Sequence, residues 1–155
     1  MASNASVATS GTKAACWGSP QTRIFGPTWP EVSASLCSLL KYGAHFVFSM
    51  SHPMATAWDG QYDRYTRTES GERLYANISN YMVEGKRTVK WVVEDYEVYH
   101  RTFSSIVNSI VNAGFLIEEC EESHVSDEMR KQYPALFGGT LHRPDFIFFR
   151  CKKQS

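Results

Sequence analysis

One short stretch holds the side chains best suited to chemistry. Ser51, His52 and Pro53 directly follow the apolar run His45–Met50. An imidazole titrates near neutral pH, so His52 can act as a general base on a hydroxyl or an amine. It can equally hydrogen-bond the backbone of a tight His-Pro turn, and both roles stand as hypotheses.

A second polar group precedes an apolar, helix-like segment. Tyr99, His100 and Arg101 can bind an acidic substrate group, or they can tie the preceding segment to that helix. Trp58 and Tyr81 can line an acceptor pocket, or they can pack in the core. His52 is therefore the candidate catalytic residue, and the candidate substrate-binding residues are Ser51, Trp58, Tyr81, Tyr99, His100 and Arg101. Arg143 is interpreted as an ion-pair residue without a chemical role.

Common catalytic and cofactor motifs are missing from the sequence. Its ten glycines include no Gly-x-Gly, and there is no P-loop, His-Glu-x-x-His or Gly-x-Ser-x-Gly. The four cysteines are scattered, with no Cys-x-x-Cys and no histidine at ligand spacing, so we expect neither a metal site nor a disulfide framework.

The first helix is predicted just after residue 28. Thr28 is a plausible N-cap with Glu31 three residues later, which is the capping-box pattern. An apolar stripe follows, formed by Val32, Leu36, Leu39 and Leu40. Gly43 ends the helix, and a strand over residues 45–50 comes next.

A second helix and two further strands are predicted in the carboxyl-terminal part. Thr102 caps the helix and Gly114 ends it. Its apolar stripe consists of Phe103, Ile106, Val107, Ile110 and Val111. Strands are expected over 115–120 and 145–151, and the apolar composition of the latter favours a strand covered on both faces.

Residues 51–99, called the lid below, carry no helical period and are rich in tyrosine and tryptophan. Two extended runs, 80–83 and 88–93, flank the sequence Glu84-Gly85-Lys86-Arg87 and predict a hairpin. Such an insertion after a strand can cover a site, or it can simply close the sheet.

In their order and in their local sequence, these segments resemble the second half of class I S-adenosylmethionine-dependent methyltransferases. The resemblance extends from about residue 31 to residue 152 and rests on five short sequence motifs that occur in the family's order. They are Phe48-Ser49-Met50-Ser51-His52-Pro53, Tyr81-Met82-Val83-Glu84-Gly85-Lys86-Arg87, Tyr99-His100-Arg101-Thr102, Gly114-Phe115-Leu116-Ile117-Glu118 and Arg143-Pro144-Asp145-Phe146. Residues 42–44, Tyr-Gly-Ala, stand where the family usually has Pro-Gly-Gly.

The resemblance implies an α/β fold with part of a Rossmann-like sheet. The strands would be the equivalents of strands five to seven, with two helices and an aromatic β-hairpin lid, and the last strand would run antiparallel beside the strand over 45–50. It also implies S-adenosylmethionine as the parent family's cofactor and methyl transfer to a small-molecule acceptor.

The same resemblance leaves the cofactor-binding half without a counterpart. We therefore expect a truncated methyltransferase-like protein that binds no cofactor by itself. The alternative is a non-catalytic remnant that acts as a binding or self-associating module. The edge of strand 45–50, where strand four of the family would pair, should then be unpaired, or covered by residues 1–30 or by another copy of the chain, which allows a homo-oligomer.

Composition bounds the remaining possibilities. Sixteen basic and sixteen acidic residues give no net charge, which argues against a nucleic-acid partner, and no apolar run is long enough to span a membrane. Residues 1–27 contain no acid and predict a disordered or transit-like leader, with the methyltransferase-like part over 28–155. A cytoplasmic location is expected, or an organelle if the leader is a transit peptide.

Overall fold

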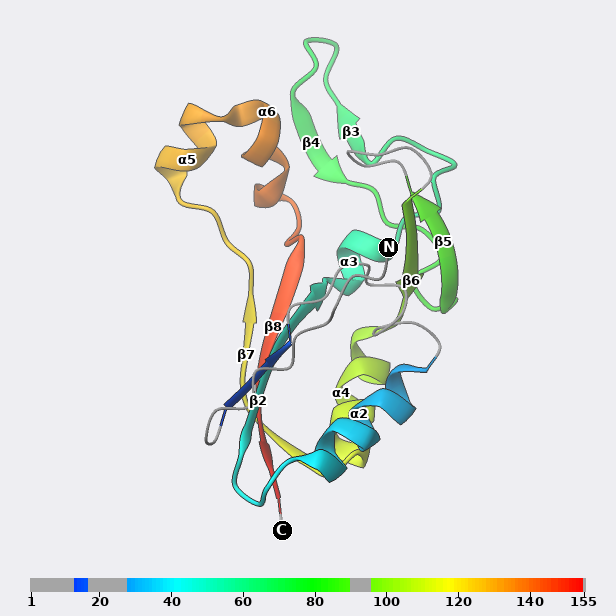
Figure 1. Cartoon of the computed structure of the whole chain (residues 1–155). Coiled ribbons are helices and arrows are strands. Elements are labelled where there is room, and N and C mark those ends of the chain that lie inside the picture. The colour runs from blue at the N-terminus through cyan, green and yellow to red at the C-terminus, as the bar shows by residue number, and fades with distance from the viewer. Residues whose placement is uncertain (1–12, 17–27, 90–95, 155) are drawn as a thin grey trace, which may run out of the picture.

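The computed structural model describes residues 13–16, 28–89 and 96–154 (Figure 1). In chain order the elements are β1 (Lys13–Cys16), α2 (Trp29–Leu39), β2 (His45–Ser51), α3 (Pro53–Thr56), β3 (Tyr65–Arg67), β4 (Arg73–Ala76), β5 (Gly85–Val89), β6 (Tyr96–His100), α4 (Phe103–Asn112), β7 (Phe115–Glu122), α5 (Asp127–Gln132), α6 (Pro134–Phe137), the 3₁₀ turn η1 (Gly138–Leu141) and β8 (Phe146–Lys153).

A mixed four-stranded sheet is the centre of the fold, in the order β1-β2-β8-β7. β1 runs parallel to β2, whereas β8 runs antiparallel to both β2 and β7. Phe48 of β2 lies opposite Phe149 of β8. The expected antiparallel last strand beside the strand over 45–50 is confirmed, and so is the partial Rossmann-like α/β class.

The core lies between one face of this sheet and the helices α2 and α4, which Figure 1 shows together beside the sheet. Side chains alternate along a strand, so β2 directs Phe46, Phe48 and Met50 to the same face, and all three are buried. The rings of Phe46 and Phe48 stack at 4.9 Å between centroids, and Phe149 stacks on Phe48 at 5.3 Å.

The first helix begins where it was predicted, but its buried face differs. Trp29, Ser33 and Cys37, spaced four residues apart, are buried, and Trp29 packs 5.2 Å from the ring of Phe48. Leu39 was placed in the apolar stripe, and this was wrong, because its side chain is 81% exposed. The large tryptophan at the first turn determines which face of the helix meets the sheet.

The second helix agrees with its prediction at both ends. The hydroxyl of Thr102 accepts a hydrogen bond from the Ser105 N–H at 3.2 Å, which is an N-cap contact. Ile106 and Ile110 are buried on the sheet side. Gly114 adopts φ +94°, a left-handed conformation that favours glycine, and ends the helix.

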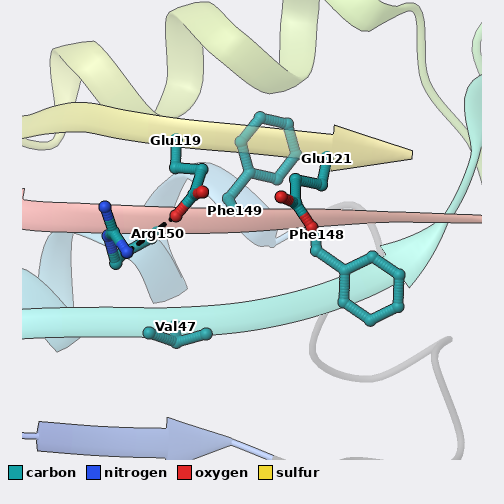
Figure 2. Close-up of a pocket in the computed structure, with 6 residues that line it drawn as sticks. All are labelled: Val47, Glu119, Glu121, Phe148, Phe149 and Arg150. Atoms are coloured by element: carbon teal, nitrogen blue, oxygen red, sulfur yellow. Dashed lines mark ion pairs between the residues drawn. The ribbon is translucent and has the colours of Figure 1, made fainter. Parts of the chain in front are cut away.

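The opposite face of the sheet carries no helix in the described part of the chain, which corrects one expectation for β8. Its apolar sequence predicted cover on both faces, yet Phe148 is 41% exposed, as is Val47 of β2. Figure 2 shows these two side chains beside Glu119, Glu121 and Arg150, where they line a hollow of about 220 Å³. Arg150 forms an ion pair with Glu119 across it at 2.7 Å.

The outer edge of β2 is covered by the chain's own residues. Ala14 pairs with Phe46 and Ala15 with Val47 in the parallel ladder between β1 and β2. Of the three arrangements expected for this edge, the structure has the one in which part of residues 1–30 occupies it. Self-association through this edge stays a prediction. Apart from 13–16, residues 1–27 of the expected leader lie outside the described residues.

The lid contains two hairpins, and the predicted one is shifted along the chain. Residues 80–83 were expected to be a strand, which is wrong: Asn80 has φ +51°, and the Val83 N–H donates to the Asn80 carbonyl at 3.0 Å, so they form a turn. The strand is β5, paired antiparallel with β6. The second hairpin, β3–β4, was not predicted, and the segment between β5 and β6 lies outside the described residues.

A connector over residues 123–145 links β7 to β8 and folds into α5, α6 and η1. It meets the lid, because the Arg73 guanidinium donates to the carbonyls of Pro134 and Ala135 at 3.2 and 3.3 Å. Among the described residues there is no helix long and apolar enough to cross a membrane, and no cluster of three metal-ligating side chains.

Candidate functional site

The candidate site lies at the edge of the sheet where β2 ends and β8 begins. The His52 N–H, one residue after β2, donates to the Asp145 carbonyl at 2.9 Å, just before β8. The lid leaves the sheet here and the connector returns to it (Figure 1). In open α/β sheets, ligands bind beyond the carboxyl ends of the parallel strands, so this edge, and not the hollow in the middle of the open face, is the candidate site.

Both ring nitrogens of His52 have partners. Nδ1 accepts a hydrogen bond from the Met54 N–H at 3.1 Å and so caps α3, while Nε2 lies 3.0 Å from Glu122 Oε1. A backbone N–H can only donate, so Nδ1 is the acceptor, and the neutral ring carries its proton on Nε2, which donates to Glu122. The turn hydrogen bond considered from the sequence is therefore present.

The surroundings of His52 favour the neutral form of its ring. Burial lowers its pKa, nearby Glu122 opposes this shift, and Arg143 adds to it. Only 4% of the surface of His52 is exposed to solvent. A neutral imidazole acts as a base through its free lone pair, and here that lone pair faces the Met54 N–H. The catalytic role of His52 stays a prediction, and it needs this cap to open.

His100 is fully buried and connects β6 to α3 and to the turn before β5. Its Nε2 lies 2.8 Å from the Tyr81 carbonyl, which only accepts, so Nε2 carries the proton. Its Nδ1 then accepts from the Thr56 hydroxyl at 2.8 Å. Burial is the main cause that lowers the His100 pKa, while the bond to Tyr81 opposes the shift.

Both histidines contact α3, although His100 ends β6 of the separate two-stranded sheet, so their expected place on one side of the sheet rim stays a prediction. His52 is the N-cap of α3, and His100 binds Thr56 at the last position of that helix. They are joined through α3 and its side chains. A pocket shared by both rings stays a prediction.

Tyr81, Tyr99 and Arg101 gather at the entrance to α4. The Tyr81 hydroxyl accepts from the Phe103 N–H at 2.9 Å, and the Arg101 guanidinium lies 4.8 Å from the centre of the Tyr99 ring. Arg101 also faces Glu84 at 3.9 Å, and Glu84 accepts hydrogen bonds from Thr102. These contacts attach the lid to α4, which is the structural role that the sequence analysis gave as an alternative to substrate binding.

Trp58 and Ser51 lie closer to the outside of the site. The indole N–H of Trp58 donates to the Tyr62 carbonyl at 2.6 Å, and the Arg64 guanidinium stacks on its ring at 4.7 Å. Ser51 is the last residue of β2 and is half-buried. A role for either in substrate binding stays a prediction.

Arg87 was missed from the sequence, although it organises the lid. Its guanidinium donates to the carbonyls of Thr56, Ser79, Asn80 and Val83, at 2.7–3.2 Å. Burial lowers its pKa, and Asp59 opposes that shift. No local pattern distinguishes this arginine from its neighbour Lys86, because the four carbonyls come together only in the fold.

A group of basic side chains around Tyr65 was also missed; we call it the basic cluster. Its members are Arg64, Arg73 and Arg143, which come from the lid and the connector. Arg73 and Arg143 lie over the Tyr65 ring at 5.2 and 5.7 Å. Arg143 was interpreted as an ion-pair residue, and its pair with Asp145 at 2.8 Å is indeed present.

The described residues do not fit a nucleoside cofactor of the kind implied by the resemblance. The usual cradle is a glycine-rich turn between the carboxyl end of a strand and a helix. Here the turn from β2 to α3 is His52-Pro53, while Gly43 and Gly114 precede strands, at the opposite end of the sheet. Gly138 and Gly139 lie against the side chains of Arg73 and Tyr65.

Comparison with known proteins supports the family. No family model matches the chain. A protein of Haemophilus influenzae whose function is not established is 27% identical over 125 residues, which cover 81% of this chain and 48% of that protein.

Two solved structures described as S-adenosylmethionine-dependent methyltransferases are similar to this chain. The protein from Listeria monocytogenes is 27% identical with a TM-score of 0.69, and the match covers 82% of this chain and 55% of that one. The protein from Mesorhizobium loti is 28% identical with the same TM-score, and the match covers 82% and 56%. The chain thus spans about half the length of the proteins it matches. With its sheet order, its two helices and these matches, the chain is similar in fold and in sequence to S-adenosylmethionine-dependent methyltransferases.

Proposed function

We propose that this chain forms the acceptor side of an S-adenosylmethionine-dependent methyltransferase that modifies a small molecule. The observation that carries the proposal is the match of 82% of the chain to two such methyltransferases, at 27% and 28% identity. The lid and the connector are joined by Arg73, and their inner ends meet where His52 bonds to Asp145, at the sheet edge where a ligand of this fold class binds. The chain would contribute acceptor binding and the exclusion of water.

The cofactor would be held by groups other than the described residues. The sequence contains no Gly-x-Gly, and the strand-to-helix turn at His52-Pro53 leaves no glycine for a close backbone approach. We infer that the chain catalyses methyl transfer only when a second segment supplies the cofactor cradle, and that alone it is inactive.

Within such an enzyme, the candidate residues would divide into positioning and acceptor-facing groups. Arg87 of β5 and His100 of β6 both bind Thr56 and so hold these two strands against α3. His52 fixes the first turn of α3 and borders the site. If His52 also accepts a proton from the acceptor, the Met54 N–H must first leave its Nδ1.

The first prediction concerns cofactor binding. Calorimetry with the full chain should show no saturable binding of S-adenosylmethionine at sub-millimolar concentration, because the chain offers no glycine turn to the cofactor. One-site binding in the micromolar range would contradict the proposal.

The matched control is a chimera. The part of the Listeria monocytogenes methyltransferase that this chain does not match is joined to residues 28–155. We expect the chimera to bind the cofactor, because the match covers only 55% of that protein, and the remainder would supply the cofactor cradle. A chimera that folds by circular dichroism, yet binds no cofactor, would count against the acceptor-side assignment.

A second candidate function is a non-catalytic binding or self-associating module. The open sheet face favours it, because Val47 and Phe148 each leave 41% of their surface exposed there. The chimera distinguishes the two candidates, since a module that no longer supports catalysis should not restore methyl transfer to a folded, cofactor-binding partner.

A further inference from the structure

The open face of the sheet exposes an apolar surface next to the hollow in its middle. Val47 and Phe148 each leave 41% of their surface exposed, and Leu116 of β7 leaves 46%. Leu116 lies opposite Lys152, which has the same parity on β8 as Phe148, so the two apolar side chains point to one face. Three large apolar side chains, one each from β2, β8 and β7, are therefore exposed together on this face.

The direction of the strands indicates which kind of layer fits this face. β1 and β2 are parallel, and β7 runs the same way as β2 because β8 is antiparallel to both. Sheets built mainly from parallel strands have helices on both faces. Within the ranges that the structure describes, α2 and α4 cover only one of the two faces. A helix is therefore the element that matches the uncovered one.

The hollow provides a place for one side chain of such a helix. Its volume is about 220 Å³, and Figure 2 shows the side chains that line it, which are Val47, Glu119, Glu121, Phe148, Phe149 and Arg150. A cavity of about 150 Å³ accommodates a benzene-sized group. A leucine or a phenylalanine on a covering helix would thus fit into the hollow, and its burial would remove further apolar surface from water.

The uncompensated charge of this face lies on the β7 side. Arg150 forms ion pairs with Glu119 at 2.7 Å and with Glu118 at 3.6 Å, so its charge is compensated within the sheet. Glu121 lies opposite Phe148 in the ladder, and it forms no ion pair with any residue that the structure describes. A carboxylate thus borders the apolar surface, and a partner with a basic side chain beside its apolar stripe would complement both.

The matched proteins contain a further part that has no counterpart in this chain. The matches cover 55% of the Listeria monocytogenes protein and 56% of the Mesorhizobium loti protein. In the proposed function, a second segment supplies the cofactor cradle, and a cradle of that kind consists of a strand, a glycine-rich turn and a helix. That segment therefore contains helical structure that needs a sheet to pack against.

We propose that the open face is the docking surface for an amphipathic helix of the segment that holds the cofactor. The apolar stripe of this helix lies over Val47 and Phe148, and a basic side chain beside the stripe faces Glu121. The proposal rests on the proposed function for the identity of the segment, and it adds the surface through which the two parts assemble.

Thiol labelling of the chimera tests this docking. Phe148→Cys is introduced into the chain alone and into the chimera, and modification by iodoacetamide at that position is followed by peptide mass spectrometry. We expect labelling to be roughly tenfold slower in the chimera, because a covered side chain reacts only through local opening. Val111→Cys is the matched control, since Val111 is 52% exposed on α4, which covers the other face, and it should be labelled equally fast in both proteins.

A charge reversal tests the basic character of the helix. Glu121→Lys in the same chimera should accelerate labelling at position 148 by about threefold, as expected for the loss of one exposed ion pair. Glu69→Lys is the matched control, because Glu69 is exposed on the turn between β3 and β4 and makes the same change of charge away from this face. Equal effects of the two variants would overturn the assignment of a basic partner.

The outcomes separate this proposal from the proposed function. Unchanged labelling at position 148 in a chimera that binds the cofactor would overturn the docking surface and leave the proposed function standing. Slower labelling in a folded chimera that binds no cofactor would support the surface and reject the proposed function. Protection of position 148 in the chain alone that grows with protein concentration would place a second copy on this face and overturn the proposal.

A second measurement uses the full chain alone and decides the matter if the chimera does not fold. Two helical peptides with the same leucine stripe, one flanked by lysines and the other by glutamates, are added at equal concentrations. The lysine peptide should slow labelling at position 148 but not at position 111, and the glutamate peptide should slow neither. Equal protection by the two peptides, or no protection by either, would overturn the proposal.

Discussion

At the scale of single residues, His52 shows how one side chain can serve as a cap and still border the site. Its Nδ1 closes the first turn of α3, and its Nε2 reaches Glu122 at the end of β7. The ring therefore fixes a strand, a helix and an edge strand relative to one another. His52, which is a candidate catalytic residue by its type, thus also has a structural role as the N-cap of α3, and the two roles can be tested separately.

The pKa shifts of the histidines predict a pH dependence of stability. Because burial lowers the pKa of both His52 and His100 below 6.5, the unfolded chain binds protons more readily than the folded one as pH falls through about 6.5. The free energy of unfolding, measured by urea titration, should be maximal above that pH and should decrease toward pH 5.

A pair of substitutions assigns the His52 share of this effect. Asn has an acceptor oxygen at the same number of bonds from the backbone as Nδ1, so His52→Asn should retain the cap and reduce the pH dependence. His52→Ala should also lose the cap, which should lower the free energy of unfolding by about 1 kcal/mol at every pH. An unchanged slope in a folded His52→Asn variant would contradict this account. In the chimera, methyl transfer retained by His52→Asn would exclude a base role.

At the scale of elements, Arg87 holds the lid by binding backbone rather than acids. Its four acceptors belong to α3 and to the turn over residues 79–83, so one side chain of β5 attaches two segments. Hydrogen bonds from a charged donor are stronger than neutral ones, and here they replace the helical or sheet contacts that the turn lacks.

Arg87→Lys should therefore loosen the lid while the sheet stays intact. A lysine has a single nitrogen and cannot reach carbonyls in a fork geometry. Hydrogen exchange of the Val83 amide should accelerate roughly tenfold or more, since at least one charged hydrogen bond is lost. The control is Lys86→Gln, at the neighbouring position, where Lys86 pairs with Glu97. Equal protection in the two variants would show that the clamp is unnecessary.

How much the sequence could predict also depends on the element. Thr102 and Gly114 define α4 because caps act within one turn, and the three long strands follow from apolar runs, two of which come shortly after a helix-ending glycine. The hairpins of the lid were displaced or missed, because short strands rich in polar residues carry little periodic signal. Arg87 and the basic cluster were missed for another reason: their partners come together only in the folded chain.

At the scale of the whole molecule, the two edges of the sheet differ in how they are protected. β1 covers β2, while the edge strand β7 carries acidic side chains, including Glu119 and Glu121 beside the hollow. Like charges discourage edge-to-edge pairing of copies. Protection by β1 depends on a four-residue parallel ladder, which is short.

Removal of residues 1–16 should therefore promote self-association. The shortened chain exposes the edge of β2, and light scattering should report dimers or larger species at concentrations where the full chain scatters as a monomer. A full chain that is already dimeric would instead support pairing by another surface, such as the open face. A shortened chain that stays monomeric would show that β1 is not needed to protect the edge.

The position of β8 also has a consequence for the order of events during synthesis. β8 lies between β2 and β7 in the sheet, yet it follows β2 by roughly a hundred residues in the chain. At typical translation rates that interval lasts on the order of 5–20 s. Until β8 emerges from the ribosome, the aromatic face of β2 has helices to cover it but no strand on its inner side. Nascent chains of this protein are thus most exposed to chaperones and to aggregation in the seconds before the sheet closes.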